Sequence, residues 1–113
     1  MRFTLIEGKV STKEEALADT GARGWHALEI DFPAEDEGLH WHDFETVAFI
    51  VDGIARAEFD DGSIEEAGPG SWVEASSRVV HRGVSSVYTA VLGFSVDPAE
   101  VTQPINKPVA DLA

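Results

Sequence analysis

Alternation of apolar and polar positions is the main pattern of this sequence, and it predicts β-strands. The clearest run starts at Trp25 and ends at Pro33, with every second residue on one face: His26, Leu28, Ile30 and Phe32. Further strands are predicted at about residues 39–51, 54–59, 63–67, 71–75, 79–84 and 86–95. Turns rich in glycine, proline and aspartate separate them, so we expect an all-β antiparallel sandwich or barrel rather than alternating strands and helices.

The two ends of the chain break this pattern. The opening segment RFTLI has strand character, and Thr12 followed by Glu15 is a helix-start signature, which predicts a short helix at about residues 13–19 that ends before Gly21. The last segment, about residues 97–113, holds three of the five prolines and is expected to run irregularly over the surface or across a neighbouring subunit. A chain of 113 residues is expected to form a single domain, residues 1–113.

The charge and composition exclude several kinds of partner and site. Lys and Arg number 8 against 21 Asp and Glu, and the formal net charge of −13 repels nucleic acid and anionic membrane surfaces. No cysteine is present, so a metal would have to be held by His, Asp, Glu or water. No apolar run reaches the length of a membrane span, and the N-terminus lacks the apolar region of a secretory signal, so we expect no membrane partner and a cytoplasmic location.

The most specific chemical signal is a pair of histidines. His40 and His42 lie two residues apart in a predicted strand, where positions i and i+2 face the same way, so both imidazoles can reach one ion. His81 follows a predicted strand-turn-strand unit and is the candidate third ligand. Imidazole ligands suit Fe, Ni, Zn, Mn or Cu, so we expect one divalent first-row metal ion as cofactor.

The region around these histidines, about residues 38–85, resembles the two sequence motifs of the cupin superfamily. The residues similar to the first motif are Gly38, His40, His42 and Gly53, and those similar to the second are Gly70 and His81. The resemblance implies a double-stranded β-helix, which is a jelly-roll barrel, of the small RmlC-like kind and here with a short N-terminal helix. It also implies that the histidines hold a metal.

One position of the first motif departs from the family pattern. Where cupins usually have a metal-binding glutamate, this chain has Thr46, and Glu45 lies one residue earlier. Strand alternation from His42 turns Thr46 inward and Glu45 outward, so Glu45 would be the fourth ligand only if a bulge at Asp43-Phe44 re-aims it. The alternative is a site of three histidines with water or substrate in the open positions, as the resemblance to cysteine and diketone dioxygenases implies.

Small side chains on the inward face predict a cavity beside the metal. Three alanines at such positions are small for the core of a barrel: Ala48, Ala55 and Ala57. We therefore expect room for a small-molecule ligand or substrate. The alternative is a narrow barrel whose interior is filled by aromatic side chains, namely Trp72, Tyr88 and Phe94.

Two classes of function fit these residues. The first is a metal-dependent enzyme, a dioxygenase-like oxidoreductase or a Lewis-acid catalyst, acting on a small organic substrate. The second is a non-catalytic barrel that binds or senses a small molecule, or a metal-free cupin of the epimerase or isomerase kind. In a metal-free enzyme, His26 or His81 would act as acid and base together with Tyr88, the single tyrosine. Because His26 shares an apolar face, it could instead be a hydrogen-bonded core residue.

A homodimer is expected from the apolar residues on the face opposite the histidines. These residues are Trp41, Val47, Phe49 and Val51. Bulky apolar side chains on an outer face need cover, which a second subunit would provide. The N-terminal strand and helix of the same chain could provide it instead.

Overall fold

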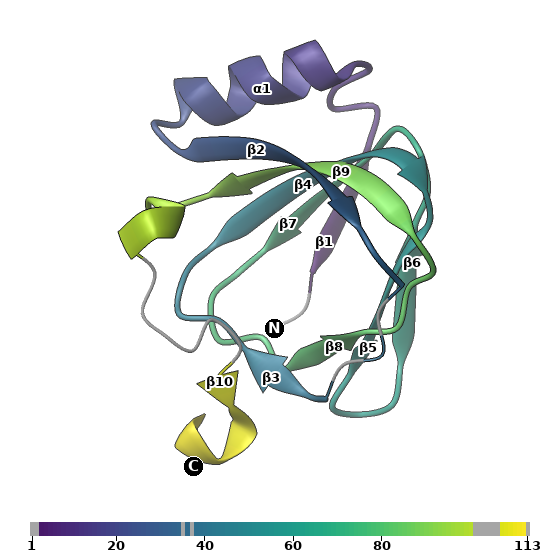
Figure 1. Ribbon diagram of the computed structural model, residues 1–113, viewed down its shortest axis with the longest axis vertical. Coiled ribbons are helices and arrows are strands. Elements are labelled where there is room, and N and C mark those ends of the chain that lie inside the picture. The colour runs from purple at the N-terminus through teal and green to yellow at the C-terminus, as the bar shows by residue number, and fades with distance from the viewer. Residues whose placement is uncertain (1–2, 35, 37, 101–106, 113) are drawn as a thin grey trace.

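The computed structural model describes residues 3–34, 36, 38–100 and 107–112, and most of its elements are strands (Figure 1). In chain order they are β1 (Thr4–Glu7), α1 (Lys13–Ala22), β2 (His26–Phe32), β3 (His40–Trp41), β4 (Thr46–Gly53), β5 (Ala55–Phe59), β6 (Ile64–Ala67), β7 (Ser71–Ala75), β8 (His81–Gly83), β9 (Tyr88–Phe94), the 3-10 helix η1 (Pro98–Glu100), β10 (Lys107–Pro108) and the 3-10 helix η2 (Val109–Leu112). The expected all-β chain with a short N-terminal helix is confirmed.

The strands form two five-stranded antiparallel sheets. The order β1-β7-β4-β9-β2 defines the helix-side sheet, and the order β10-β3-β8-β5-β6 defines the histidine-side sheet. In Figure 1, α1 lies against the outer face of the helix-side sheet, and the histidine-side sheet lies across from its inner face. The chain passes repeatedly between the sheets, as a jelly roll requires. No strand pairing joins the two sheets among the described residues, so the jelly roll is not closed into a barrel.

The strand predicted at residues 39–51 is two strands that belong to opposite sheets. Residues 42–45 carry the chain from β3 in one sheet to β4 in the other. The Arg78 N–H donates to the His42 carbonyl at 2.8 Å, and Phe44 is buried, so this crossing is held by contacts with distant segments. The prediction of one continuous strand was wrong. The alternation of apolar residues continues through the bend, so the sequence pattern gives no sign of the break. The other predicted strands are confirmed, each end within about two residues.

The helix α1 begins where the sequence predicts and ends later. The Thr12 hydroxyl accepts a hydrogen bond from the Glu15 N–H at 3.1 Å, which is the N-cap that the pattern indicates. The predicted end before Gly21 was wrong. The helix continues to Ala22 and stops before Gly24, whose φ of +76° suits glycine and turns the chain away from the helix. Among the described residues, no helix has the length and apolar character needed to cross a membrane.

A hydrophobic core lies between α1 and the outer face of the helix-side sheet. Its buried members are Val10, Ala16, Val47, Phe49, Trp72 and Val91. The helix and the sheet pack tightly at Gly93, where a Cβ would lie 2.6 Å from a Thr20 methyl and 2.7 Å from a Val47 methyl. Val47 and Phe49 are therefore covered by their own chain, as the alternative to a dimer interface required. The homodimer stays a prediction, and it would have to use another surface.

The end of the chain adds a strand beside β3. In β10, Lys107 lies opposite Trp41, and Pro108 lies opposite His40. The Trp41 indole N–H donates to the Pro108 carbonyl at 2.9 Å, and the buried Lys107 places its Nζ 3.8 Å from an Asp43 carboxylate oxygen. The expectation of an irregular tail was wrong for β10, because a proline is accommodated at a sheet edge, where its missing N–H costs no ladder bond. Residues 101–106 of the tail lie outside the described residues.

Candidate metal centre

Three histidines from two strands and one crossing segment meet on the inner face of the histidine-side sheet. His40 begins β3 and His81 begins β8, and the two strands pair antiparallel with these residues directly opposite each other. Side chains of directly opposed residues lie on the same face of a sheet. His42 follows β3 in the segment that leads to the other sheet, and it also faces the space between the sheets.

The three imidazoles form a nearly equilateral triangle. The ring centroids of His40 and His81 are 4.7 Å apart, those of His40 and His42 are 5.0 Å apart, and those of His42 and His81 are 5.1 Å apart. One ring nitrogen from each of the three residues lies within 4.8 Å of those from the other two. In the part of the chain that the structure describes, no other set of three His, Cys, Asp or Glu side chains is gathered in this way. The convergence that strand alternation predicted for these residues is present.

Backbone carbonyls orient two of the three rings. The Nδ1 atom of His40 is 2.7 Å from the Gly38 carbonyl oxygen, and the Nδ1 atom of His81 is 2.9 Å from the Val79 carbonyl oxygen. A carbonyl oxygen only accepts, so Nδ1 carries the proton in each ring and Nε2 of the neutral imidazole carries the lone pair. Metal-binding histidines usually have this arrangement, because the second hydrogen bond fixes the tautomer and the ring plane. The donor set therefore fits one divalent first-row metal ion held by three imidazoles.

Aromatic side chains pack around the triad. The His42 ring stacks on Phe44 at a centroid distance of 5.2 Å, and the His81 ring meets Phe3 edge to face at 4.9 Å. His40 is only 5% exposed. These contacts restrict the rotamers of the imidazoles, so that a metal would meet ligands that are already in place.

Glu45 does not join this group. Its side chain is exposed, and its backbone N–H is tied to the Ser95 hydroxyl at 2.9 Å. Thr46 faces inward and lines the cavity beside the histidines, as the alternation predicts. The donor geometry therefore fits the three-histidine alternative, and a fourth ligand at Glu45 stays a prediction.

A cavity of about 590 Å³ lies between the sheets, next to the histidines. The three alanines that the sequence singled out, Ala48, Ala55 and Ala57, all line it. Trp72 lies in the core beneath α1 and does not fill this space, whereas Tyr88 and Phe94 form part of its wall. The predicted void is confirmed, and its volume lies within the usual range of about 300–1,000 Å³ for small-molecule sites.

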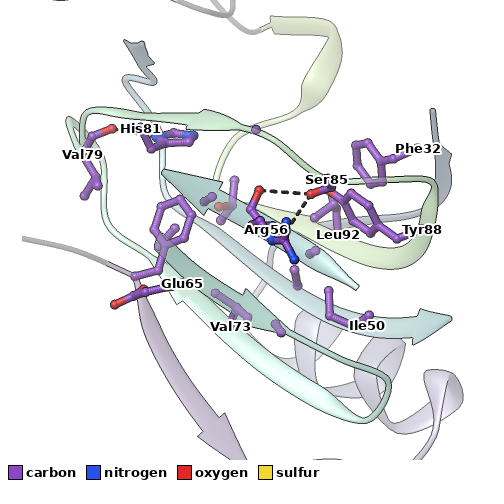
Figure 2. A pocket seen from close by; sticks show the side chains of 18 of the residues that line it. Phe32, Ile50, Arg56, Glu65, Val73, Val79, His81, Ser85, Tyr88 and Leu92 are labelled. Carbon is purple, nitrogen blue, oxygen red and sulfur yellow. Dashed lines mark hydrogen bonds between the residues drawn. The ribbon is translucent and has the colours of Figure 1, made fainter. Parts of the chain in front are cut away.

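The two residues proposed as acid and base lie apart from the triad. His26 is exposed and is not among the residues that line the cavity. Leu28, next on the same face of β2, is 47% exposed, so this face is open to solvent at that end of the strand. Tyr88 does line the cavity, where its ring stacks on Phe32 at 4.6 Å. His26 pairs with Phe94 and Phe32 pairs with Tyr88, at opposite ends of the β2–β9 ladder. Figure 2 shows Tyr88 and His81 at opposite ends of the pocket. A catalytic pair of Tyr88 with either histidine therefore has no geometric support and stays a prediction.

The sequence did not reveal the contribution of β1 and β6 to the cavity. Phe3 and Leu5 line it from the N-terminal segment, and Glu65 and Glu66 line it from β6. The alternation of Leu5 with its neighbours was the available signal, but only the pairing of β1 with β7 places it over the cavity. In the same way, the pairing of β5 with β6 places Glu65 opposite Ala57, beside the cavity.

The arginines that flank His81 have partners outside the triad. Arg82 hydrogen-bonds the Glu58 carboxylate, and this bond raises the pKa of the guanidinium above its usual value. Arg78 lies over the Trp41 ring, 5.7 Å from its centroid, where cation–π attraction holds it. Arg82 thus links β8 to β5, and Arg78 contacts β3, so both side chains stabilise strands next to the site.

This chain is similar to several proteins of known structure. No protein-family model matches it, and no curated protein sequence matches it significantly. The protein NMB1881 from Neisseria meningitidis is similar, with 25% identity and a TM-score of 0.55 over 63% of this chain and 73% of that one. A DUF861 family protein from Thermotoga maritima is similar over 80% of this chain and 96% of that one, with 14% identity and a TM-score of 0.54.

A cupin protein from Bacteroides fragilis is similar over 67% of this chain and 66% of that one, with 16% identity and a TM-score of 0.46. The motif resemblance at residues 38–85 agrees with the structure itself, in which two sheets face each other and the histidines come from β3, the segment that follows it and β8. The fold of this chain is cupin-like.

Proposed function

We propose that this protein binds one divalent first-row metal ion through His40, His42 and His81 and uses it as an enzyme on a small organic molecule. The observation that carries the proposal is the triad itself, three ring nitrogens within 4.8 Å beside a cavity of about 590 Å³. Three protein ligands with positions left for water or substrate are typical of catalytic rather than structural metal sites. The metal is Fe, Ni, Zn, Mn or Cu, since imidazole nitrogen suits all five.

The chain's own residues have defined roles in this proposal. The metal, when bound, supplies dioxygen activation in a dioxygenase-like reaction or Lewis-acid polarisation of a substrate oxygen. The carbonyls of Gly38 and Val79 keep the protons of His40 and His81 on Nδ1, so that both Nε2 atoms can ligate. Phe44 and the inner faces of the sheets give the site an apolar surround that limits access of water.

Metal content and metal-dependent oxygen uptake test the proposal. Protein produced without an affinity tag and supplemented separately with each of the five metals should retain about one ion per chain after desalting. Oxygen uptake by the iron-loaded protein should then rise above that of the chelator-treated protein when small organic substrates are screened. Protein that stays empty, and whose melting temperature ignores added metal, would show that the ligand assignment is wrong.

A non-catalytic binding module is the second candidate, and the size of the cavity favours it. A chain that binds a small molecule with or without metal, but neither consumes oxygen nor alters the ligand, would support this reading. A metal-free epimerase-like reaction has less support, because Tyr88 lies far from His81 in the pocket and His26 lies outside it (Figure 2).

A further inference from the structure

Among the residues that the structure describes, the wall that the helix-side sheet gives to the cavity contains no charged side chain. That wall consists of Leu5, Ile30, Phe32, Thr46, Ala48, Ile50, Val73, Ala75, Tyr88, Leu92 and Phe94. The only polar groups in this set are two hydroxyls, on Thr46 and Tyr88. A charge placed against this wall would lose its hydration without gaining a partner, which is costly.

Among the described residues, the Arg, Asp and Glu side chains that line the cavity come from β5 and β6, and two of the three form an ion pair. The Arg56 guanidinium donates to one Glu66 carboxylate oxygen from Nη2 at 2.7 Å and from Nε at 3.1 Å. The two side chains are 47% and 50% exposed, so the ion pair is in contact with solvent. Glu65, the third charged residue, is also exposed. Arg56 is therefore neutralised, and the acidic groups around it disfavour an anionic ligand.

The hydroxyl of Ser85 is used within the fold. Its Oγ accepts from the Arg56 backbone N–H at 2.6 Å and donates to the Arg56 carbonyl at 3.0 Å, two bonds drawn in Figure 2. The single hydroxyl proton of Ser85 is thus used in a hydrogen bond to the backbone. A ligand with many hydroxyls, such as a sugar, would leave several of them unpaired in this cavity, and each unpaired buried group costs free energy.

We infer that the cavity takes an uncharged, predominantly apolar small molecule and discriminates against anions and sugars. This inference names the substrate class for the site proposed above and rests on that proposal for the role of the metal. The polar end of such a molecule would point to the histidines. Its apolar body would lie along the uncharged wall of the helix-side sheet, toward Phe32 and Tyr88 at the far end (Figure 2).

Two dyes that share one anilinonaphthalene skeleton test the inference. N-phenyl-1-naphthylamine is neutral, and 8-anilinonaphthalene-1-sulfonate carries a sulfonate. Fluorescence titrations use chelator-treated protein, so that no metal can bind the sulfonate, and about 0.5 M salt to screen the net charge of −13. We expect the neutral dye to bind with a Kd at least about tenfold lower than that of the anionic dye, and maltose not to displace it.

Variants that fill the cavity show where the dye binds. Ala57→Phe on β5 and Ala48→Phe on β4 each add a ring to the cavity, from opposite walls. Each should raise the Kd of the neutral dye by about tenfold or more. Ile64→Phe is the matched control, because Ile64 is 52% exposed and lies outside the cavity lining. Near-ultraviolet circular dichroism checks the fold, and Ala57→Val with Ala48→Val gives the same comparison if a phenylalanine prevents folding.

Three results would overturn the inference. They are failure of the neutral dye to bind, binding that the folded cavity variants leave unchanged, and binding of the anionic dye that equals that of the neutral dye. In the last case, if the Arg56→Gln variant no longer bound the anionic dye, Arg56 would be identified as the group that binds the anion. Since the titrations use metal-free protein, a failed metal assignment would show in metal content and would leave the dye result intact.

Discussion

His40 and His81 are directly opposed partners in the β3–β8 ladder, and their rings lie 4.7 Å apart. This cross-strand pair brings together two candidate ligands that are far apart in sequence. Each ring also reaches back to the carbonyl of the second residue before it, Gly38 for His40 and Val79 for His81. The pair therefore has the same local geometry on both strands, and His42 completes the triad from the segment that follows β3.

Removing a histidine of the triad should remove the metal. We expect His40→Ala and His81→Ala each to weaken metal binding by more than about a hundredfold, since only two imidazoles remain. His26→Ala is the control, because His26 lies outside the cavity and should leave metal binding unchanged. Isothermal titration measures the metal affinity of each variant, and elemental analysis measures its metal content. Equal metal retention in His81→Ala and the wild type would exclude the triad as the site.

The contact between β10 and β3 should influence the metal site. Trp41→Phe removes the indole N–H that donates to the Pro108 carbonyl beside His40. We expect a loss of about 0.5–1.5 kcal/mol in stability and a weaker affinity for metal of about twofold to tenfold. Trp25→Phe is the control on the other side of the molecule, where the ring packs against the core beneath α1. A drop in melting temperature with unchanged metal affinity would show that β10 supports the fold but not the site.

Glu74 should make part of the stability depend on pH. Hydrogen bonds from the Trp72 indole and from Arg23 lower the pKa of this carboxyl below its usual value of 4.5. A depressed folded-state pKa adds stability above the unfolded-state value, and this contribution is lost as the pH falls through the folded-state value. Glu74→Gln should therefore cost about 0.5–1 kcal/mol at pH 7 and measurably less at about pH 3, a modest effect because the side chain is partly exposed.

Urea denaturation at several pH values measures this difference. Glu100→Gln, at an exposed position in η1, is the control and should change stability little at either pH. A cost for Glu74→Gln that is equal at both pH values would mean that the lost interaction is packing rather than charge.

Two glycine substitutions should change stability in opposite directions. Gly93→Ala places a Cβ 2.6 Å from a Thr20 methyl and 2.7 Å from a Val47 methyl, both in the packed layer under α1. We expect a loss of about 1–3 kcal/mol from overpacking. Gly21→Ala meets no atom within 4 Å and lies inside the helix, so it should add about 0.5–1 kcal/mol through helix propensity. Thermal unfolding measures both, and a stabilising Gly93→Ala would show that α1 can move away from the sheet.

Local sequence determined which residues face inward and where turns occur. The alternation through Ala48 and Ile50 predicted the inner face of β4, and the spacing of His40 and His42 predicted two candidate ligands on one side of the chain. The Thr12 cap likewise marked the start of α1. These features depend on the period of the strand and on hydrogen bonds between neighbours along the chain, so they can be read from a short window of sequence.

Only the tertiary structure decided which strands meet and which sheet each one joins. The break at residues 42–45 depends on distant partners such as Arg78, and the position of His81 opposite His40 depends on the β3–β8 register. The cover over Val47 comes from α1, and His26 is exposed and lies outside the residues that line the cavity. Strand alternation has a period of two in every sheet, so it fixes the face of a residue but carries no information on the partner strand. That choice is made by packing and long-range pairing once the whole chain folds.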